Sequence, residues 1–351
     1  SMDRDLSIGG NLTLNAGQIT NLDGTTSTAE GSEAVLDISN IGKVQTENGV
    51  VQSAKEGLHN FLDHFAQDGK ITLGGDETKI AVDMWGDGAF DLTKYDIGTE
   101  EDQTLAHKLN LLNINDGTGK GKEYTYIWVS TGEQLAGIQQ YYEQETNAGR
   151  KTNILSYNFA LKNDIDASYV TDYKAIGAGT TDGYTGTFDG RDNRIIGLDT
   201  TKTSDGSGQT LINAGIFDTI GTGKNADGTE QVGTVEDLRV YSGTFSGTDS
   251  AGAVAGVNNG KISNVTAFGN VVDVNNQTGN DSSYAGGIAG TNSGSIDKSS
   301  AIGTATQSSK DIAENAEAAA GGIAGLNSGT ISNSSANSAV NASAGNATAL
   351  G

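Results

Sequence analysis

The chain has 351 residues, a formal net charge of −23, 51 glycines, and neither cysteine nor proline. The negative charge argues against a protein that wraps nucleic acid, and the absence of cysteine excludes a disulfide scaffold and thiol chemistry. Because no run of about 18 apolar residues is present, the sequence predicts no membrane insertion.

Many glycines without proline are typical of tightly turned structure rather than of disorder. Aromatic residues make up only 6% of the chain, so we expect a core built from Ala, Val, Ile and Leu in thin layers. Ser1-Met2 resembles a cloning scar, and we therefore expect a fragment of a longer protein. The absence of a signal peptide then says nothing about export.

Residues 3–115 are predicted to form a β-rich segment with one inserted helix. Short alternating apolar runs separated by Gly, Asn and Asp predict strands. Residues 54–67 break this pattern, because Ser53-x-x-Glu56 forms a capping box before apolar residues at helical spacing. His59 and His64 lie five residues apart, off a shared helical face, so we predict solvent-exposed side chains rather than a metal pair.

Two short motifs in this half are weak. Gly86 to Asp91 resembles one copy of a calcium-binding nonapeptide repeat, which needs tandem copies, so we predict no metal there. Residues 116–123 are rich in Gly and Lys and are predicted to be a linker. Lys122 precedes Glu123 and not Ser or Thr, so a phosphate-binding loop is excluded.

The remaining residues, 124–351, are predicted to form one repetitive unit. Ser130-x-x-Glu133 is a second capping box and predicts a helix over residues 131–145. Short strands that end in Gly or Asp follow it. A ten-residue motif then starts at Ala251, Ala285 and Ala320, and the predicted copies lie near 214–240, 251–284, 285–319 and 320–351.

A repeat of this length predicts a stacked, solenoid-like fold in which equal offsets lie above one another. The several glycines of each copy argue against a helical repeat. We therefore predict an all-β parallel β-helix with two short flanking or capping helices (54–67 and 131–145). The residues expected to form structural ladders in the stack are Asn258, Asn292, Asn327, Ile262, Ile296 and Ile331.

The motif Ala-Gly-Gly-Ile-Ala-Gly-x-Asn-Ser-Gly-x-Ile resembles the GLUG motif of large bacterial surface proteins. Five preceding stretches are similar to the lead-in found with that motif: residues 133–135, 163–166, 175–177, 188–190 and 195–198. Residues 7–20 resemble repeats of filamentous-haemagglutinin-type exoproteins of two-partner secretion systems. This resemblance implies a right-handed, single-stranded β-helix, export through an outer-membrane transporter partner, and adhesion or a surface-stalk role outside the bacterium.

The GLUG motif also occurs in IgA-cleaving metallopeptidases, which would need a His-Glu-x-x-His zinc motif. The chain has three histidines, His59, His64 and His107, and none lies in that pattern. The resemblance therefore implies a non-catalytic segment, with no catalytic, cofactor-binding or metal-binding residue.

The predicted function is a secreted or cell-surface adhesin segment whose partner is a host cell-surface glycan or an extracellular protein. Ligand contacts are expected in residues 222–232, 274–283 and 307–318, and at the aromatics Tyr184, Tyr241 and Tyr284. The alternative is a polysaccharide-degrading enzyme, which would use carboxylates on one face of the stack. The candidate carboxylates are Asp164, Asp166, Asp172, Asp189 and Asp192.

Overall fold

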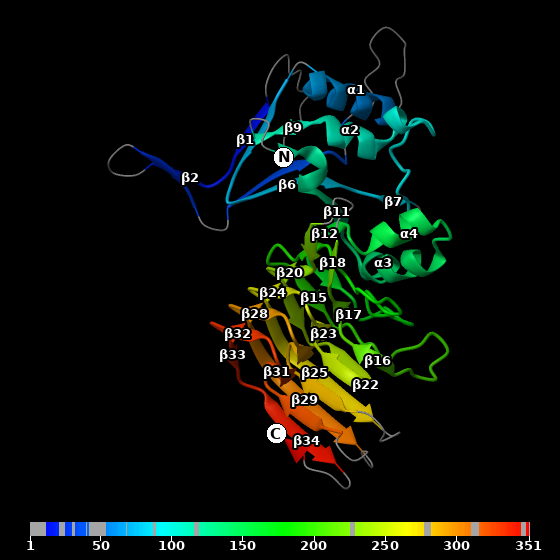
Figure 1. Cartoon of the computed structure of the whole chain (residues 1–351), viewed down its shortest axis with the longest axis vertical. Helices are drawn as coiled ribbons and strands as arrows, with labels where there is room; N and C mark the ends of the chain where they lie inside the picture. Colours follow the sequence, from blue (N-terminus) through cyan, green and yellow to red (C-terminus); the bar gives the residue numbers. More distant parts are fainter. Residues whose placement is uncertain are drawn as a thin grey trace. The chain divides into compact units, whose positions relative to one another are not determined.

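Parallel β-strands are the main regular structure of the described chain in the computed structural model (Figure 1). The structure describes residues 12–20, 25–29, 32–39, 41, 54–67, 69–86, 89–115, 119–224, 229–276, 282–309, 316–344 and 349–350. These residues belong to two units. Unit 1 comprises residues 1–87 and 91–128, and unit 2 comprises residues 88–90 and 129–351.

The described part of unit 1 contains short sheets, two α-helices and two 3-10 helices. Strands β1 and β5 pair in parallel in one sheet, and β4, β6 and β11 pair in parallel in another. The elements of unit 1 are β1 (Leu12–Asn15), β2 (Gln18–Thr20), β3 (Thr26–Thr28), β4 (Glu33–Asp37), α1 (Ala54–Gln67), β5 (Ile71–Gly74), β6 (Glu77–Val82), β7 (Trp85–Gly86), the 3-10 helix η1 (Glu101–Gln103), α2 (Leu105–Leu111), β9 (Asn113–Ile114), β10 (Gly119–Lys120), the 3-10 helix η3 (Gly121–Tyr124) and β11 (Thr125–Val129, whose last residue is assigned to unit 2).

The helix predicted over residues 54–67 is α1. Leu58, Leu62 and Phe65 are buried on one side of it, as the helical spacing requires. His59 lies on the same buried side, with Nε2 at 2.9 Å from the Tyr95 carbonyl oxygen, so the prediction of a solvent-exposed histidine is wrong. His59 precedes the buried Leu62 by three residues, and residues three apart share a helical face, so His59 follows the apolar residues into the core.

Unit 2 contains the short strand β8, then two helices, and then stacked strands. Its elements are β8 (Ala89–Phe90), α3 (Gly132–Gln144), α4 (Ala148–Ile154), β12 (Asn158–Leu161), β13 (Ile165–Asp166), β14 (Thr187–Asp189), β15 (Arg194–Ile196), β16 (Leu211–Ala214), β17 (Phe217–Ile220), β18 (Thr222–Lys224), β19 (Glu230–Val232), β20 (Thr234–Glu236), β21 (Arg239–Tyr241), β22 (Thr244–Gly252), β23 (Ala255–Asn258), β24 (Lys261–Ser263), β25 (Thr266–Asn276), β26 (Ser283–Gly286), β27 (Ala289–Asn292), β28 (Ser295–Asp297), β29 (Ser300–Ser309), β30 (Ala318–Gly321), β31 (Ala324–Asn327), β32 (Thr330–Ser332), β33 (Ser335–Ala336), β34 (Ala339–Ala344) and β35 (Ala349–Leu350).

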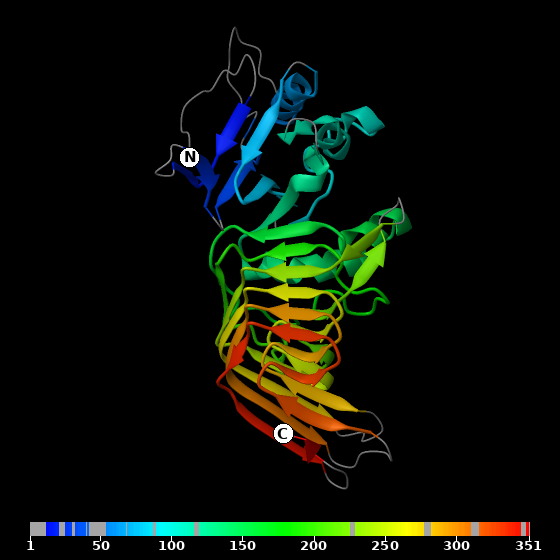
Figure 2. The same cartoon turned by 60° about the vertical axis from the view of Figure 1, so that its left-hand side comes forward.

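Each repeat copy passes through three sheets in turn, and we call one such passage a coil. The first sheet of unit 2 has the order β12-β14-β20-β24-β28-β32, and the second has the order β17-β23-β27-β31. The third sheet contains β21, β25, β29 and β34, together with β22, β26 and β30. Figure 2 shows these strands lying one above another from green to red. Unit 2 is therefore solenoid-like, as the repeat predicts.

Glycines close the turn between the second and first sheets. A Cβ atom on Gly294 would lie against the carbonyl oxygen of Gly260 in the preceding coil, closer than the 3.0 Å that real Cβ atoms keep. Gly329 stands in the same relation to Gly294. The backbones of successive coils approach so closely here that only glycine fits.

The long strands of the third sheet correct two predicted loops. Residues 274–283 and 307–318 were expected to be loops, but β25 continues to Asn276 and β29 to Ser309. The two strands pair in register up to Asn276 and Ser309, so their main-chain groups are satisfied by each other. In the predicted loop 222–232, strands β18 and β19 form an antiparallel hairpin. The tips of all three segments lie outside the described residues.

The helices and the linker also differ from the prediction. The cap of α3 is Thr131, which accepts from the Gln134 N–H at 3.2 Å, one residue later than expected. Helices α2 and α4 were missed because seven residues are too few to show an apolar period. The described part of the predicted linker, residues 119–123, lies in β10 and η3, and the units divide after residue 128. The helices of the described chain are too short or too polar to cross a membrane.

Candidate binding surface

A ladder of asparagines runs up the turn of three successive coils. Asn258 Nδ2 donates to Asn292 Oδ1 at 2.7 Å, and Asn292 Nδ2 donates to Asn327 Oδ1 at 2.7 Å. Asn258 and Asn292 are fully buried, whereas Asn327 is exposed. The amides therefore join neighbouring coils to one another and serve the stack rather than a ligand.

An aliphatic ladder runs beside it in the first sheet. Ile262 pairs in register with Ile296, and Ile296 pairs in register with Ile331. The first two side chains are fully buried, and Ile331 is half-buried in the last coil. These residues fill the interior, so the positions that all copies of the repeat share serve to pack the core.

Tyr184 was expected to be an exposed ligand contact, and that expectation is wrong. Its side chain is fully buried, and its hydroxyl donates to the Tyr157 carbonyl oxygen at 2.9 Å. Its ring lies 5.1 Å from that of Phe217. The sequence around a single tyrosine flanked by glycines does not show whether its side chain faces the core or the surface. In the structure, Tyr184 packs in the aromatic cluster of the core.

Tyr241 lies in an outward-facing row on the third sheet. It pairs in register with Phe268, and Phe268 pairs in register with Ile302. The ring centroids of Tyr241 and Phe268 lie 5.6 Å apart. Phe268 is 48% exposed and Ile302 is 41% exposed, while Tyr241 is half-buried. We call these three residues the apolar stripe.

The sequence signal for the apolar stripe was present but unused. Phe268 and Ile302 each follow a ladder isoleucine, Ile262 and Ile296, at the same offset of six residues. Residues at the same position of successive copies stack on one another. An apolar residue six positions after each ladder isoleucine therefore predicts a second row of apolar side chains. The burial of Ile296 and the exposure of Ile302 separate the interior row from the surface row.

Tyr284 lies in β26 and is half-buried. Its hydroxyl donates to Glu317 Oε2 at 3.2 Å. Burial is the largest cause that raises the pKa of Tyr284, and the carboxylate of Glu317 adds to it. Tyr284 therefore contacts the next coil with its hydroxyl and stands apart from the apolar stripe.

Two of the candidate catalytic carboxylates are ion-paired to arginines on the third sheet. Asp164 Oδ2 accepts from Arg194 Nη2 at 2.6 Å and from Arg194 Nε at 3.0 Å. Asp192 Oδ1 accepts from Arg239 Nη2 at 2.5 Å. The hydrogen bonds from the Arg194 side chain and backbone hold the pKa of Asp164 below its ordinary value of 3.8. A general acid would need the opposite shift.

Two others bind the backbone of turns. Asp166 accepts from the Ser168 N–H at 2.9 Å, and hydrogen bonds from Ser168 lower the pKa of Asp166. Asp172 accepts from the Ser204 N–H with both oxygens, at 3.1 and 3.2 Å. These contacts are typical of aspartates that shape turns.

The Asp164–Arg194 pair predicts a pH dependence. Since the pKa of Asp164 is lowered on folding, the stability that the pair contributes is present above about pH 4, and it is lost as the pH falls through the folded pKa. NMR titration should give a midpoint for the Asp164 carboxyl below 3.8, and Arg194→Gln should return it toward that value. An unchanged midpoint in Arg194→Gln would show that the arginine does not set the pKa.

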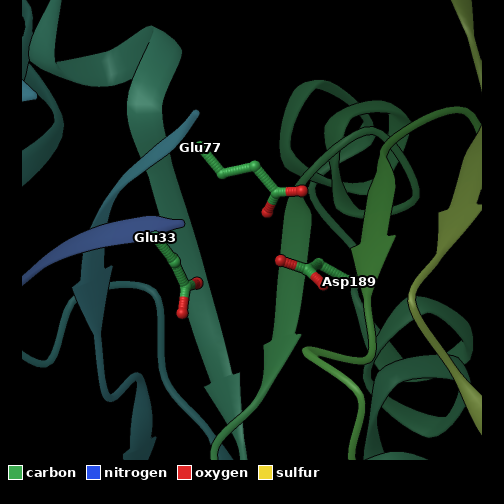
Figure 3. Close-up of side chains that lie close together, drawn as sticks. All are labelled: Glu33, Glu77 and Asp189. Carbon is green, nitrogen blue, oxygen red and sulfur yellow. The ribbon is translucent and has the colours of Figure 1, made fainter. Parts of the chain in front are cut away.

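The acidic side chains of β4 and β6 in unit 1 surround a lysine. Glu33 and Glu77 are register partners (Figure 3). Lys79 Nζ is buried and lies 3.2 Å from Glu33 Oε1 and 2.7 Å from Glu77 Oε2. Figure 3 also draws Asp189, which belongs to unit 2 and accepts from the Arg191 N–H at 2.7 Å. Within unit 1, the lysine provides the counter-charge for both glutamates.

The other suggested metal positions have structural partners. His64 lies edge-on to Phe65, with ring centroids 5.0 Å apart. The segment from Gly86 to Asp91 lies partly outside the described residues. Asp91 Oδ1 accepts from the N–H and the hydroxyl of Thr93, at 2.9 and 2.8 Å, as in a tight turn.

No protein-family model matches the chain, and no curated protein matches it either. A crystal structure of a candidate immunoglobulin A1 protease from Bacteroides ovatus is similar to it, with 18% identity and a TM-score of 0.38. The match covers 61% of this chain and 67% of that chain. A similarity this low carries no inference about the fold or activity of the present chain, whose repeat and surface are known from its own residues.

Proposed function

We propose that the chain is a non-catalytic segment of a bacterial secreted or cell-surface adhesin of the GLUG-motif, filamentous-haemagglutinin-like kind. Unit 2 would be a right-handed, single-stranded parallel β-helix that serves as a stalk and as a surface for host ligands. The parallel, in-register stacking of successive repeat copies supports this proposal. Export through an outer-membrane transporter partner is part of the same proposal and rests on the resemblance of residues 7–20.

The observation that carries the ligand-binding proposal is the apolar stripe. Exposed aromatic and aliphatic side chains in a row, held by a rigid sheet, are typical of interaction sites. Thr266 and Ser300 precede Phe268 and Ile302 by two residues, so they present hydroxyls on the same face of the strands. Aromatic rings beside hydroxyls suit a ligand that has apolar C–H faces and polar edges. A host glycan has this chemistry, and so does a tyrosine-rich or threonine-rich extracellular protein.

The test compares binding by the wild-type chain and by the double variant Tyr241→Ala, Phe268→Ala. Both are screened against host glycans and against extracellular matrix proteins. We expect the wild type to bind at least one ligand and the double variant to lose about tenfold or more of that affinity, because stacked aromatics dominate such contacts. The matched control is Ile212→Ala, since Ile212 is 66% exposed on β16, outside the apolar stripe.

Three outcomes would count against the proposal. The wild type could bind nothing in either screen, or the double variant could bind as well as the control. Release of new sugar ends from a polysaccharide would instead favour the enzyme alternative. Thermal unfolding of each variant shows whether a loss of binding comes from a loss of structure.

A further inference from the structure

The outer face of the third sheet extends beyond the apolar stripe. Strand β25 carries Phe268 and runs on between its neighbours β22 and β29 (Figure 1). Val272 and Val274 are buried, whereas Val271 is 47% exposed. Asp273 lies between the two buried valines and is half-buried. Because side chains alternate along a strand, Asp273 points to the outer face, on which Val271 and Phe268 are exposed.

Asp273 is the centre of a row of polar side chains that crosses three strands. It pairs in register with Ser246 of β22 and with Thr306 of β29. Both partners are half-buried, as Asp273 is. Neighbouring strands lie about 4.8 Å apart, so a hydroxyl stands on each side of the carboxylate. We call Ser246, Asp273 and Thr306 the polar row.

The side chains of the polar row are unpaired within the described part of the chain. None of the three makes a hydrogen bond or an ion pair with another described residue. Burial raises the pKa of Asp273 above its ordinary value of 3.8. A half-buried carboxylate without a hydrogen-bond donor destabilises the fold. Such a group is typical of a site that a ligand completes.

A row of mixed character joins the polar row to the apolar stripe. Val271 pairs in register with Thr244 on one side and with Thr304 on the other. Phe268 and Asp273 are five residues apart, so at the rise of a β-strand the two positions are separated by about 15 Å. A ligand made of several linked units fits this length better than a single small molecule does.

The charges of the third sheet select against an acidic ligand. Its described strands carry two cations, Arg194 and Arg239, and these are ion-paired to Asp164 and Asp192. On the described strands of this sheet, no unpaired cation therefore remains for a carboxylate or sulfate group of a ligand. Asp273 and the net charge of −23 would repel such a group, whereas neutral hydroxyl groups donate to a carboxylate.

We propose that the outer face of the third sheet binds a neutral glycan chain laid along β25, with one sugar on Tyr241 and Phe268 and a later sugar on Asp273. Sugar rings place their C–H faces on aromatic rings. Two neighbouring hydroxyls of one sugar donate to the two carboxylate oxygens, and the hydroxyls of Ser246 and Thr306 donate to or accept from the same sugar. This inference rests on the proposed ligand-binding function and adds to it the class of ligand and the polar row.

The experiment measures the affinity of the wild-type chain for three kinds of immobilised probe. These are neutral oligosaccharides of galactose, glucose or mannose, the same oligosaccharides capped with sialic acid, and a lysine-rich peptide. We expect the chain to bind at least one neutral oligosaccharide and to bind its sialylated form at least about tenfold more weakly, because the sialic acid carboxylate meets Asp273. The peptide tests whether the carboxylate serves a basic protein instead, and we expect it not to bind.

The variant Asp273→Thr removes the carboxylate and continues the row with the residue type found at Thr306. Its affinity for the neutral oligosaccharide should fall at least about tenfold, since hydrogen bonds to a charged group are lost. Its melting temperature should equal or exceed that of the wild type, because the unpaired carboxylate is gone and threonine favours strands. The matched control is Asp182→Thr, which removes the same charge at an exposed bend outside the third sheet and should leave the affinity unchanged.

The outcomes separate this inference from the proposed function. Binding of a protein or an acidic glycan through Tyr241 and Phe268, unchanged in Asp273→Thr, would overturn the inference and leave the proposed function standing. Peptide binding that Asp273→Thr abolishes would also overturn the inference, because the carboxylate would then serve a protein partner. A wild type that binds none of these ligands would overturn both. A melting temperature of Asp273→Thr well below that of Asp182→Thr would show that Asp273 supports the fold, which contradicts its assignment to a ligand.

Discussion

Replacing Gly294 by alanine is expected to lower the free energy of unfolding of unit 2 by about 3 kcal/mol. The new Cβ would meet the carbonyl oxygen of Gly260 and the carbonyl carbon of Asn259, which are backbone atoms of the preceding coil. Backbone atoms cannot rotate away as a side chain can, so relief requires the two coils to separate. Urea unfolding followed by circular dichroism measures the loss.

The control for this variant is Gly206→Ala. Gly206 has a φ of +75°, and a Cβ there would have no atom within 4 Å. It should therefore lose only the backbone strain of a left-handed residue, about 1 kcal/mol. Equal losses at Gly206 and Gly294 would mean that backbone conformation, and not the close approach of coils, explains the conserved spacing of glycine in the three copies.

Replacing Asn292 by alanine is expected to lower the free energy of unfolding by about 3 kcal/mol as well. Asn292 is fully buried, and it both accepts from Asn258 Nδ2 and donates to Asn327 Oδ1. Its removal leaves a buried donor on Asn258 without its short partner and leaves a gap in a packed interior. The same unfolding measurement applies.

Asn259→Ala is the matched control, because Asn259 is exposed and lies in the same turn as Asn258. It should change the free energy of unfolding by less than about 0.5 kcal/mol, as is usual for surface substitutions. Asn327→Ala should fall between the two, since Asn327 is exposed at the last rung. If Asn292→Ala were as mild as Asn259→Ala, the ladder would add nothing to the stability of the stack.

The sequence predicts the stacked part of the fold best where one offset is repeated. Ile262, Ile296 and the asparagines could be placed because three copies superimpose, and each copy checks the others. Tyr184 and His59 occur once, outside the copies, and nothing local distinguishes a buried single residue from an exposed one. The length of β25 was missed because its outer half pairs with β29, a contact between residues far apart in the sequence.

The candidate surface was predicted only in part for the same reason. Tyr241 was singled out as an aromatic, but the shared offset of Phe268 and Ile302 in the repeat was not used, and the register of the third sheet shows the three residues in one row. The carboxylates of Asp164 and Asp192 were grouped by their closeness in sequence. Their arginine partners, Arg194 and Arg239, are 30 and 47 residues away and could not be inferred from spacing.

The asparagine ladder gives the stack a chemical direction. All its amides point the same way, with a carbonyl oxygen free at Asn258 and the amino end at Asn327. Hydrogen bonds aligned in a chain polarise one another, so each added rung strengthens the bonds already made. Each formed coil therefore presents an asparagine to the next one, and we expect the stack to grow coil by coil from whichever coil forms first.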